Sequence, residues 1–539
     1  MFSCRRIYLK NFIKNCYEDI YKKCDIQSIS TDIREWKPTI GLEIHAQILT
    51  KSKLFSGAST NFNCPINSSV SLFDCAIPGT MPVLNKKCVE AGILTALALS
   101  CEINAVSMFE RKHYFYSDLP VNIISINNIS LSSKAGFQIT QQKKPLAVNG
   151  EIKFNVFKPE IHKQPYTKSS KIKQIQLEQD SGRSFHNEDF GRSLIDLNRA
   201  GIPLMELVFE PDLTNGEEAA ALVKELCFIL QLLGTCSCKM EEGALRVDAN
   251  VSVNKSNAPL GIRTEIKNIG SIGAINRAIE YEIKRQISIL EAGNQVINET
   301  RAWNPVDKKT ILMREKEEKH DYRFMPEPNL LPLYLHIDNT MENKYNLINV
   351  PSLKKQLPEL PEQIRQKLQN TLTPHVFIAI MSNLELYLLF RDILNNGKHR
   401  KPQLVAQILI SEVCAFIDEH KLNLAFCVCN QKYIEKTIDL LQAKVINQHI
   451  LRRLLNKLLS ESNKMPEQIV EENNWFMISN EEKLEILCLK VLKTNPKWVK
   501  KYKRGNKKIF KKFLHEVVTL TEGCAEMVKV SKIMTRLLS

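Results

Sequence analysis

Hydrophobic and polar residues follow two different patterns along this chain of 539 residues. Between residues 36 and 345, short segments alternate apolar and polar residues and end at turn signals such as Asn149-Gly150, which is typical of strands in a half-buried sheet. From about residue 350, leucine-rich segments repeat at helical spacing, as in 450–459, and glycine becomes scarce. We therefore expect an α+β fold: an antiparallel β-sheet with flanking helices at 36–345, a helical domain at 346–462 and a helical tail at 463–539.

Four of the expected strands place polar side chains on one face, because alternate residues of a strand point to the same side of the sheet. A half-solvated antiparallel sheet gives the same alternation, and for any single strand it is the simpler explanation. The polar sets are Glu43, His45 and Gln47 in 42–48; Gln176, Glu178 and Asp180 in 175–180; Arg246, Asp248, Asn250 and Ser252 in 246–253; and Arg263, Glu265 and Lys267 in 262–267.

If these polar faces converge, they predict a particular chemistry. Several carboxylates beside one imidazole repel one another unless a divalent cation lies among them. A hard cation next to Arg and Lys suits phosphoryl transfer from ATP, because that reaction depends on positioning and charge neutralisation. The chain has no P-loop, no Rossmann glycine motif after a strand, no protein-kinase loops and no Gly-x-Ser-x-Gly elbow. Any ATP site is therefore built on an uncommon scaffold.

Most of the excess positive charge lies in two short segments. The chain has 74 Lys and Arg against 59 Asp and Glu, a net charge of +15. Residues 1–17 contribute +4 and residues 497–512 contribute +9, with no acid in either segment. The first segment could form an amphipathic helix, which favours a mitochondrial transit peptide at 1–35; an ordinary basic extension is the alternative. No apolar run reaches the roughly 18–20 residues that a membrane-spanning helix needs.

The basic segment 497–512 predicts contact with a polyanion. Its cations recur every three or four residues, so many of them could share one helix face, with Gly505 as a bend or cap. A purely solvated face is the weaker explanation, because such faces usually mix both signs of charge. Trp498, Tyr502 and Phe510 are expected to pack in a core rather than stack on bases.

The fifteen cysteines fit a reducing compartment, since they are scattered, odd in number and without framework spacing. Two Cys-x-Cys pairs occur, at 236–238 and 427–429, without a matching second pair or clustered histidines. We interpret them as structural thiols rather than as a zinc site.

Residues 121–134 (VNIISINNISLSSK) differ from their surroundings, since they are almost wholly Ile, Asn, Ser and Leu. The segments on either side would join naturally into one loop, and a translated short intron would look like this. The hypothesis is therefore a gene-model artefact or a lineage-specific loop, and sequencing the mature transcript across the junction decides between them.

Several motifs, in order along the chain, resemble the B subunit of glutamyl-tRNA(Gln) amidotransferase in its mitochondrial form. The most specific is 194–208, LIDLNRAGIPLMELV. The resemblance runs from about residue 38 to the C-terminus. The other motifs are 41–45 with 52–56, 78–85, 111–116, 240–250, 265–268 and 321–328.

The resemblance implies an ATP-dependent carbon–nitrogen ligase with glutamine as the amido donor. The family uses ATP and Mg²⁺ to phosphorylate the side-chain carboxylate of glutamate mischarged onto tRNA(Gln), and ammonia then displaces the phosphate to give Gln-tRNA(Gln). The ammonia comes from the A subunit, a glutaminase, and the small C subunit completes the heterotrimer. For this chain, the resemblance implies a cradle-like catalytic domain at 36–345 and a role in translation in the mitochondrial matrix, without membrane insertion.

Carried onto this sequence, the resemblance assigns roles to residues of the polar faces. Glu206 is either structural or part of the site, with neither favoured, and Gln179 is left out of the ligand set because bacterial relatives commonly carry a second acid there. The expected metal ligands are Glu43, His45, Glu178, Asp248 and Glu265, which form the catalytic set together with Lys267. ATP or substrate is expected to contact Arg199, Arg246, Asn250 and Asn268. The tail residues expected to contact tRNA are Lys500, Lys501, Lys503, Arg504, Lys507 and Lys508.

Two alternatives stay open at this point. One is a tRNA-binding scaffold of the same ancestry that has lost its chemistry, and the other is a general mitochondrial RNA-binding protein. Neither needs the five expected metal ligands to lie together, so their positions in space discriminate between the three hypotheses.

Overall fold

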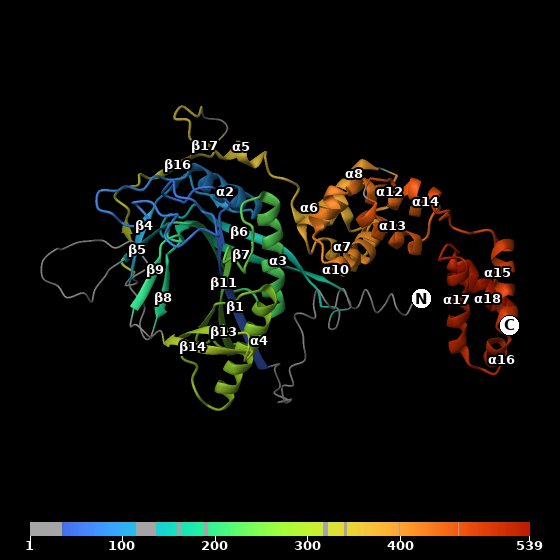
Figure 1. Ribbon diagram of the computed structural model, residues 1–539. Helices are drawn as coiled ribbons and strands as arrows, with labels where there is room; N and C mark the ends of the chain where they lie inside the picture. Colours follow the sequence, from blue (N-terminus) through green and yellow to red (C-terminus); the bar gives the residue numbers. More distant parts are fainter. Residues whose placement is uncertain are drawn as a thin grey trace. The chain divides into compact units, whose positions relative to one another are not determined.

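The computed structural model describes residues 35–114, 136–158, 162, 164–187, 192–315, 322–338, 342–397, 399–461 and 463–538. The expected leader, apart from residue 35, and the segment 121–134 lie outside the described residues. The described residues up to Gln366 form one compact unit, the sheet unit, and those from Lys367 onward form a second, the helical unit. Figure 1 shows the strands in the sheet unit and packed helices in the helical unit, which confirms the expected α+β class.

A nine-stranded sheet is the centre of the sheet unit, in the order β14-β13-β12-β11-β1-β10-β7-β6-β2. Neighbouring strands are antiparallel except β12 and β13, which run parallel. The strands are β1 (Trp36–Gln47), β2 (Glu102–Ile103), β6 (Ala147–Val156), β7 (Tyr166–Gln179), β10 (Pro203–Phe209), β11 (Leu245–Lys255), β12 (Thr264–Lys267), β13 (Glu299–Asn304) and β14 (Lys309–Glu315).

The four strands expected from alternation correspond to β1, β7, β11 and β12. β1, β7 and β11 begin before the expected segments, whereas β12 begins at Thr264 rather than at Ile262, and Asp180 lies one residue beyond the end of β7. The strand β10, which lies between β1 and β7, was not among those expected from alternation. Its presence places a further set of side chains in the middle of the polar face.

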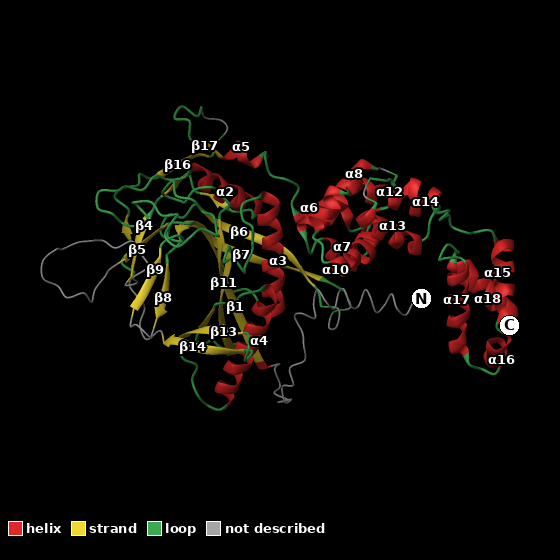
Figure 2. Cartoon of the chain, viewed as in Figure 1, coloured by secondary structure: helices red, strands yellow, loops and turns green. Residues whose placement is uncertain are grey.

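Three helices cover the apolar face of this sheet: α2 (Lys86–Ala98), α3 (Gly216–Leu233) and α4 (Ile272–Glu291). Each helix begins after an Asn or Ser whose side chain accepts a hydrogen bond from a first-turn backbone N–H. Alternate residues of β1, such as Ile40, Leu42 and Ile44, are fully buried in one core with residues of these helices. Figure 2 shows α3 and α4 alongside the strands. The polar residues of the strands therefore point to the opposite face.

Three smaller sheets complete the sheet unit. A loop at 49–85 connects β1 to α2. The unit ends with α5 (Val350–Lys354) and most of α6 (Pro361–Leu368), whose last two residues are counted with the helical unit. The small sheets are β4 (Glu110–Tyr114) with β5 (Gly136–Thr140) and β15 (Met325–Pro326); β16 (Leu333–His336) with β3 (Val106–Ser107) and β17 (Ile348–Asn349); and β8 (Arg183–Asn187) with β9 (Arg192–Asp196).

The helical unit is built from short amphipathic helices. The leucine-rich segment at 450–459 lies in a helix, as its spacing predicts. No described helix combines the length and the apolar character needed to cross a bilayer. The helices are α7 (Pro374–Ile380), α8 (Leu384–Asn396), α9 (Pro402–Ile408), the π-helical turn η3 (Leu409–Val413), α10 (Cys414–His420), α11 (Leu424–Cys429), α12 (Gln431–Gln442), α13 (Gln448–Ser460), α14 (Pro466–Glu472), α15 (Glu481–Thr494), α16 (Pro496–Lys503), the 3₁₀ turn η4 (Lys507–Ile509), α17 (Phe510–Leu520) and α18 (Met527–Leu538).

Candidate active site

The polar face of the sheet assembles around β1. His45 of β1 lies opposite Glu206 of β10 on one side and opposite Arg246 of β11 on the other. Glu43 lies opposite Asp248 of β11. Directly opposed residues of antiparallel strands have Cβ atoms only about 4.5–5.5 Å apart. Strand pairing alone therefore brings these five side chains together.

His45, Glu178 and Glu206 form a group that can hold a metal ion. One ligand atom from each residue lies within 4.8 Å of the other two. His45 Nδ1 and Glu178 Oε2 are buried without a hydrogen-bond partner among the described residues, an unfavourable state that a bound ligand relieves. Burial lowers the pKa of His45, which keeps the ring neutral, and burial raises the pKa of both Glu178 and Glu206. Because a divalent cation favours the neutral imidazole and the ionised carboxylates, these residues fit one.

Neighbouring amides and one lysine hold the two carboxylates in place. Gln138 of β5 donates to Glu178 Oε1 at 2.5 Å, and Gln176 of β7 donates to Glu206 Oε2 at 2.6 Å. Lys112 of β4 lies opposite Gln138 in the small sheet. Burial lowers the pKa of Lys112, but the carboxylates of Glu178 and Glu206 outweigh it and the net pKa is raised. Lys112 therefore stays charged and offsets part of the negative charge of the group.

Lys267 links a second group of charges on the same face. Its Nζ forms an ion pair with Asp248 and lies 3.2 Å from Glu265 Oε1. Burial lowers the pKa of Lys267, but these two carboxylates outweigh that effect and keep the amine protonated. Asn250 donates to Glu43 Oε1 at 3.2 Å. Glu43, Asp248 and Glu265 thus each interact with another side chain of the protein.

Two arginines meet Asp180 at the end of β7. Arg246 Nη2 donates to Asp180 Oδ2 at 2.7 Å, and Arg199 Nε lies 3.6 Å from the same oxygen. Arg199 also donates to the backbone carbonyls of Ser181 at 2.8 Å and Gly182 at 2.6 Å. Arg246 Nε is buried and has no hydrogen-bond partner among the described residues. That N–H is available to an oxygen of a bound substrate.

A cavity of about 470 Å³ lies between these groups. Its size is that of a site for a small molecule, and its lining is strongly charged. The predicted residues that line it are His45, Glu178, Arg246, Asp248, Lys267 and Asn268. The lining does not include the other predicted site residues of the sheet unit, which are Glu43, Glu265, Asn250 and Arg199. Lys112, Gln138 and Asp180 line the cavity as well.

The loop before α4 forms one wall of the cavity. Asn268, Ile269 and Gly270 line it next to Lys267. Asn268 has a φ of +60°, and the space that a Cβ would fill at Gly270 is open. The N-terminus of α4 follows directly, capped by Ser271. A turn of this kind before a helix N-terminus, beside a lysine, favours an anionic group.

The sequence reasoning missed or left undecided four residues of this site. Glu206 is the only charged residue in β10, and this isolated carboxylate in an apolar strand is the signal that could have decided its role. Asp180 was placed on a polar face but given no role. Nothing in the local pattern marks Lys112 or Gln138, because they reach the cavity through the small β4–β5 sheet. Gln179 alternates with Glu178 and so points to the other face of β7.

The expected tRNA-contacting residues of the tail are all exposed. None of the six forms an ion pair with another described residue. Lys500, Lys501 and Lys503 lie in α16, Arg504 is its C-cap, and Lys507 and Lys508 lie in the η4 turn. Gly505, with a φ of +96°, turns the chain between the two elements. Trp498, Tyr502 and Phe510 pack against the core of the tail, as expected; the rings of Trp498 and Phe513 are 5.7 Å apart.

The two Cys-x-Cys pairs contain free thiols. Cys236 and Cys238 lie in the loop after α3, where the Cys238 N–H donates to Cys236 Sγ at 3.3 Å. The group of metal-capable side chains in the described part of the chain contains no cysteine. The interpretation as structural thiols is consistent with this arrangement.

Two family models match this chain in sequence. The GatB/GatE catalytic domain matches residues 38–341, and the GatB domain matches residues 388–538. The chain is 48% identical over 513 residues to the B subunit of the mitochondrial glutamyl-tRNA(Gln) amidotransferase of Aedes aegypti, covering 94% of each chain. It is 41% identical to the human protein of the same name, over 94% of this chain and 89% of the relative. It is 39% identical to the B subunit of the aspartyl/glutamyl-tRNA(Asn/Gln) amidotransferase of Rickettsia canadensis, over 93% of this chain and 97% of the relative. The chain therefore belongs to the GatB family, the B subunits of the tRNA-dependent amidotransferases.

Proposed function

We propose that this chain is the ATP-using subunit of a mitochondrial glutamyl-tRNA(Gln) amidotransferase. The complex is a carbon–nitrogen ligase that converts Glu-tRNA(Gln) to Gln-tRNA(Gln) with glutamine as amido donor. One observation carries this proposal. His45, Glu178 and Glu206 form a metal-capable group with two buried ligand atoms that have no hydrogen-bond partner among the described residues, and His45 and Glu178 of this group line a charged cavity large enough for a phosphate-bearing substrate. A pure RNA-binding scaffold gains nothing from such a group, which favours catalysis over the two binding alternatives.

The metal-capable group would hold Mg²⁺ at the phosphates of ATP. When bound, the cation neutralises phosphate charge and ATP supplies the phosphoryl group that makes the carboxylate oxygen of the substrate a leaving group. The protein's own contribution is orientation and charge balance. Lys112 and Lys267 remain protonated on either side of the cavity, and Arg246 offers its Nε–H to an oxygen. Asp248 and Glu265 hold Lys267 in place rather than binding the metal directly.

The tail supplies the expected tRNA contact. Its exposed cations form no ion pair with an acid of the described residues, and they are suited to the phosphate backbone of a folded RNA. The names of the relatives specify a B subunit, so we expect the glutaminase A subunit and the small C subunit as partners. The relatives from animals are named mitochondrial, which supports a location in the mitochondrial matrix.

Reconstitution tests this proposal directly. The chain is co-expressed with its cognate A and C subunits, and conversion of Glu-tRNA(Gln) is measured with ATP, Mg²⁺ and glutamine. We expect amidation by the wild-type complex and a loss of about 100-fold or more for Glu178→Gln, which keeps the shape of the side chain but removes its charge. The matched control is Glu151→Gln, the same change at an exposed position on β6 of the same sheet.

A second readout separates metal binding from turnover. Mn²⁺ is a suitable spectroscopic probe, because both carboxylate and imidazole are acceptable ligands for it. Electron paramagnetic resonance should detect Mn²⁺ bound to the wild-type complex and to Glu151→Gln, and weaker binding to Glu178→Gln. Equal Mn²⁺ binding and equal amidation by the three proteins would contradict the proposed site.

A further inference from the structure

A threonine of β13 contacts a carboxylate of the polar face. Thr300 lies opposite Glu265 in the parallel β12–β13 pair, and both residues are buried. The hydroxyl of Thr300 donates to Glu265 Oε2 at 3.1 Å. Figure 1 shows β13 and β14 beside α4, and these two strands end the order of the central sheet. The contact therefore connects the outer strands of the sheet to the candidate site.

A network of charges holds the opposite face of β13. Glu299 and Arg301 flank Thr300 and point to the side of the helices, because alternate residues of a strand point to opposite faces. Arg301 Nη1 donates to Glu299 Oε1 at 2.8 Å, and Arg285 Nη2 of α4 lies 2.8 Å from the same oxygen. Arg301 Nε also donates to Thr310 Oγ1 of β14 at 2.8 Å. α4 and β14 thus hold β13 on one face and set the position of Thr300 on the other.

The pairing of β13 with β14 is irregular at Thr300. Thr300 lies opposite Arg314, whereas Arg301 lies opposite Leu312, so the register shifts between these two neighbours. A β-bulge bends a strand locally and redirects its side chains, and bulges are common beside active sites. The irregularity falls at the residue whose hydroxyl contacts Glu265. Its position favours a role for Thr300 in the site rather than in strand pairing alone.

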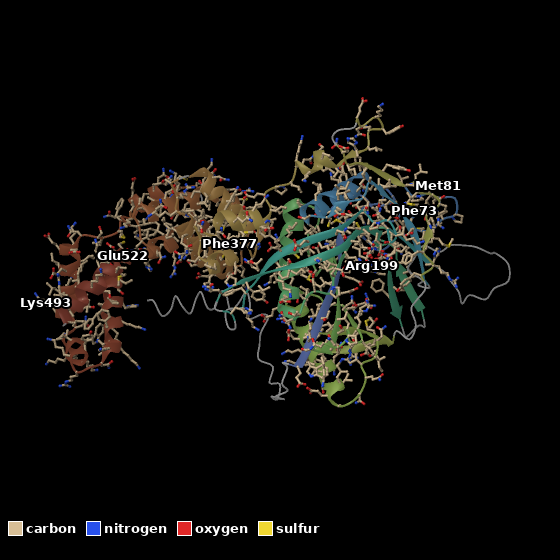
Figure 3. All side chains as sticks on the ribbon, turned by 180° about the vertical axis from the view of Figure 1, so that it is seen from behind. Phe73, Met81, Arg199, Phe377, Lys493 and Glu522 are labelled. Atoms are coloured by element: carbon tan, nitrogen blue, oxygen red, sulfur yellow. The ribbon has the colours of Figure 1, made fainter. Side chains whose placement is uncertain are left out.

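Glu265 connects Thr300 to a cation of the cavity. Its Oε1 lies 3.2 Å from the Nζ of Lys267, which lines the cavity and also pairs with Asp248. A lysine carries a point charge on a flexible stem, so its partners determine where that charge lies. Arg199, labelled in Figure 3, differs in this respect, because its guanidinium donates to two backbone carbonyls. The position of the Lys267 charge depends instead on carboxylate side chains, and Thr300 holds one of them.

We propose that Thr300 is a positioning residue for ATP, which acts through Glu265 to hold the Lys267 ammonium group toward the phosphates. This inference rests on the proposed function, which assigns the cavity to ATP. Thr300 is not part of the cavity lining. Its hydrogen bond keeps the carboxylate of Glu265 in one orientation, and that carboxylate keeps Lys267 in place. Charge that is already positioned needs no rearrangement when a phosphate binds, so loss of the hydroxyl should weaken the binding of ATP and spare that of tRNA.

Removal of the hydroxyl tests the proposal. Isothermal titration calorimetry measures the Kd of the reconstituted complex for a non-hydrolysable ATP analogue with Mg²⁺. Thr300→Val keeps the shape of the side chain and should raise this Kd about tenfold, the scale of one lost hydrogen bond to a charged group. Thr300→Ser keeps the hydroxyl, and its Kd should stay close to the wild-type value. The matched control is Thr264→Val, the same change at a buried position of β12 whose hydroxyl has no hydrogen-bond partner among the described residues, and its Kd should not change.

A role in packing alone predicts the opposite order of effects. Thr300→Ser loses the methyl group that Thr300→Val keeps, so packing makes the Ser variant the weaker one. A wild-type Kd for Thr300→Val, or a larger rise for Thr300→Ser than for Thr300→Val, would overturn the proposal. If Thr300→Val folds poorly, Thr300→Ala and Thr300→Ser provide the same comparison, because they differ only in the hydroxyl.

A double-mutant cycle shows whether the effect passes through Lys267. Lys267→Met should weaken binding of the analogue by itself, and Thr300→Val should cause no further loss in that background. A further loss of about tenfold in the double variant would overturn the route through Lys267. In steady-state kinetics, Thr300→Val should raise the KM for ATP and leave the KM for Glu-tRNA(Gln) unchanged. A wild-type complex that binds no ATP analogue would contradict the proposed function itself, whereas wild-type binding that Thr300→Val leaves unchanged overturns only the role of Thr300.

Discussion

The cavity of the sheet unit and the basic tail use the same kinds of charged residue in opposite ways. In the cavity, Lys267 and Arg246 lie against carboxylates, and their charges are balanced inside the protein. In the tail, Lys500, Lys501 and Arg504 are exposed and form no ion pair with another described residue. A balanced cluster in a partly desolvated site acts strongly on one small group at short range, whereas unbalanced surface cations act on a polyanion through a salt-screened field.

The largest effect is expected where a charge pair is fully buried. Lys53 and Asp74 form an ion pair at 3.0 Å with both side chains at most 1% exposed. Asp74→Ala leaves the ammonium group of Lys53 buried without its carboxylate partner. The free energy of unfolding of the sheet unit, measured by urea denaturation, should therefore fall by about 3–5 kcal/mol. Lys503→Ala removes an exposed tail charge and should change the free energy of unfolding of the helical unit by less than about 0.5 kcal/mol. Equal effects would remove the distinction between the two settings.

The next effect concerns the residue that the sequence left undecided. Glu206→Ala removes one of three grouped ligand atoms and should lower kcat for amidation about 100-fold or more, with tRNA affinity unchanged. Glu43→Ala should cost less, because Glu43 is not part of the metal-capable group and accepts a hydrogen bond from Asn250. Steady-state kinetics on the reconstituted complex measures both. A greater loss for Glu43→Ala would restore the ligand set expected from the sequence.

The converse experiment changes the tail and spares the chemistry. Replacing Lys500, Lys501, Lys503 and Arg504 by Ala should raise the Kd for tRNA about 10- to 100-fold and reduce the slope of log K against log salt by about three. The kcat at saturating tRNA should stay unchanged. Filter binding over a salt series provides the measurement. If the slope does not change, these cations form only a solvated surface.

The smallest effect is expected at the turn between α16 and the η4 turn. Gly505 has a φ of +96°, which side chains rarely adopt, so Gly505→Ala should destabilise the helical unit by about 1 kcal/mol and weaken tRNA binding only slightly. Gly57→Ala is the matched control, because nothing lies within 4 Å of the added Cβ and no unusual φ is involved. Thermal unfolding should show a lower Tm for Gly505→Ala alone.

Alternation in the sequence was sufficient to predict the strands that have one apolar and one polar face. β1, β11 and β12 were found for this reason, together with the part of β7 that carries Glu178. β10 was missed as a strand because its apolar residues run nearly without interruption, with Leu204 and Met205 both buried. Burial on both faces removes the two-residue period, and with it the signal.

The site could be predicted only in part, because ligand identity depends on strand register. Sequence alone gives the face of each strand but not which residues lie opposite one another. His45 and Glu178 are in the metal-capable group, while Glu43 lies two residues away from His45 on β1, opposite Asp248. Glu206 joins the group because the β1–β10 register sets it against His45. Lys112 and Gln138 enter through a separate small sheet, which no local pattern could place.

The order of strands in the central sheet also sets when this protein can fold. β1 is the first strand of the sheet in the sequence, yet its neighbours β10 and β11 begin at Pro203 and Leu245. During synthesis, β1 therefore stays unpaired until strands far along the sequence have been made. Such a topology slows folding and leaves unpaired strands open to aggregation. His45 cannot face Glu206 until β10 has been synthesised and has paired with β1. An unfinished or misfolded copy thus lacks the candidate metal site altogether, and competence for the reaction is tied to completion of the sheet.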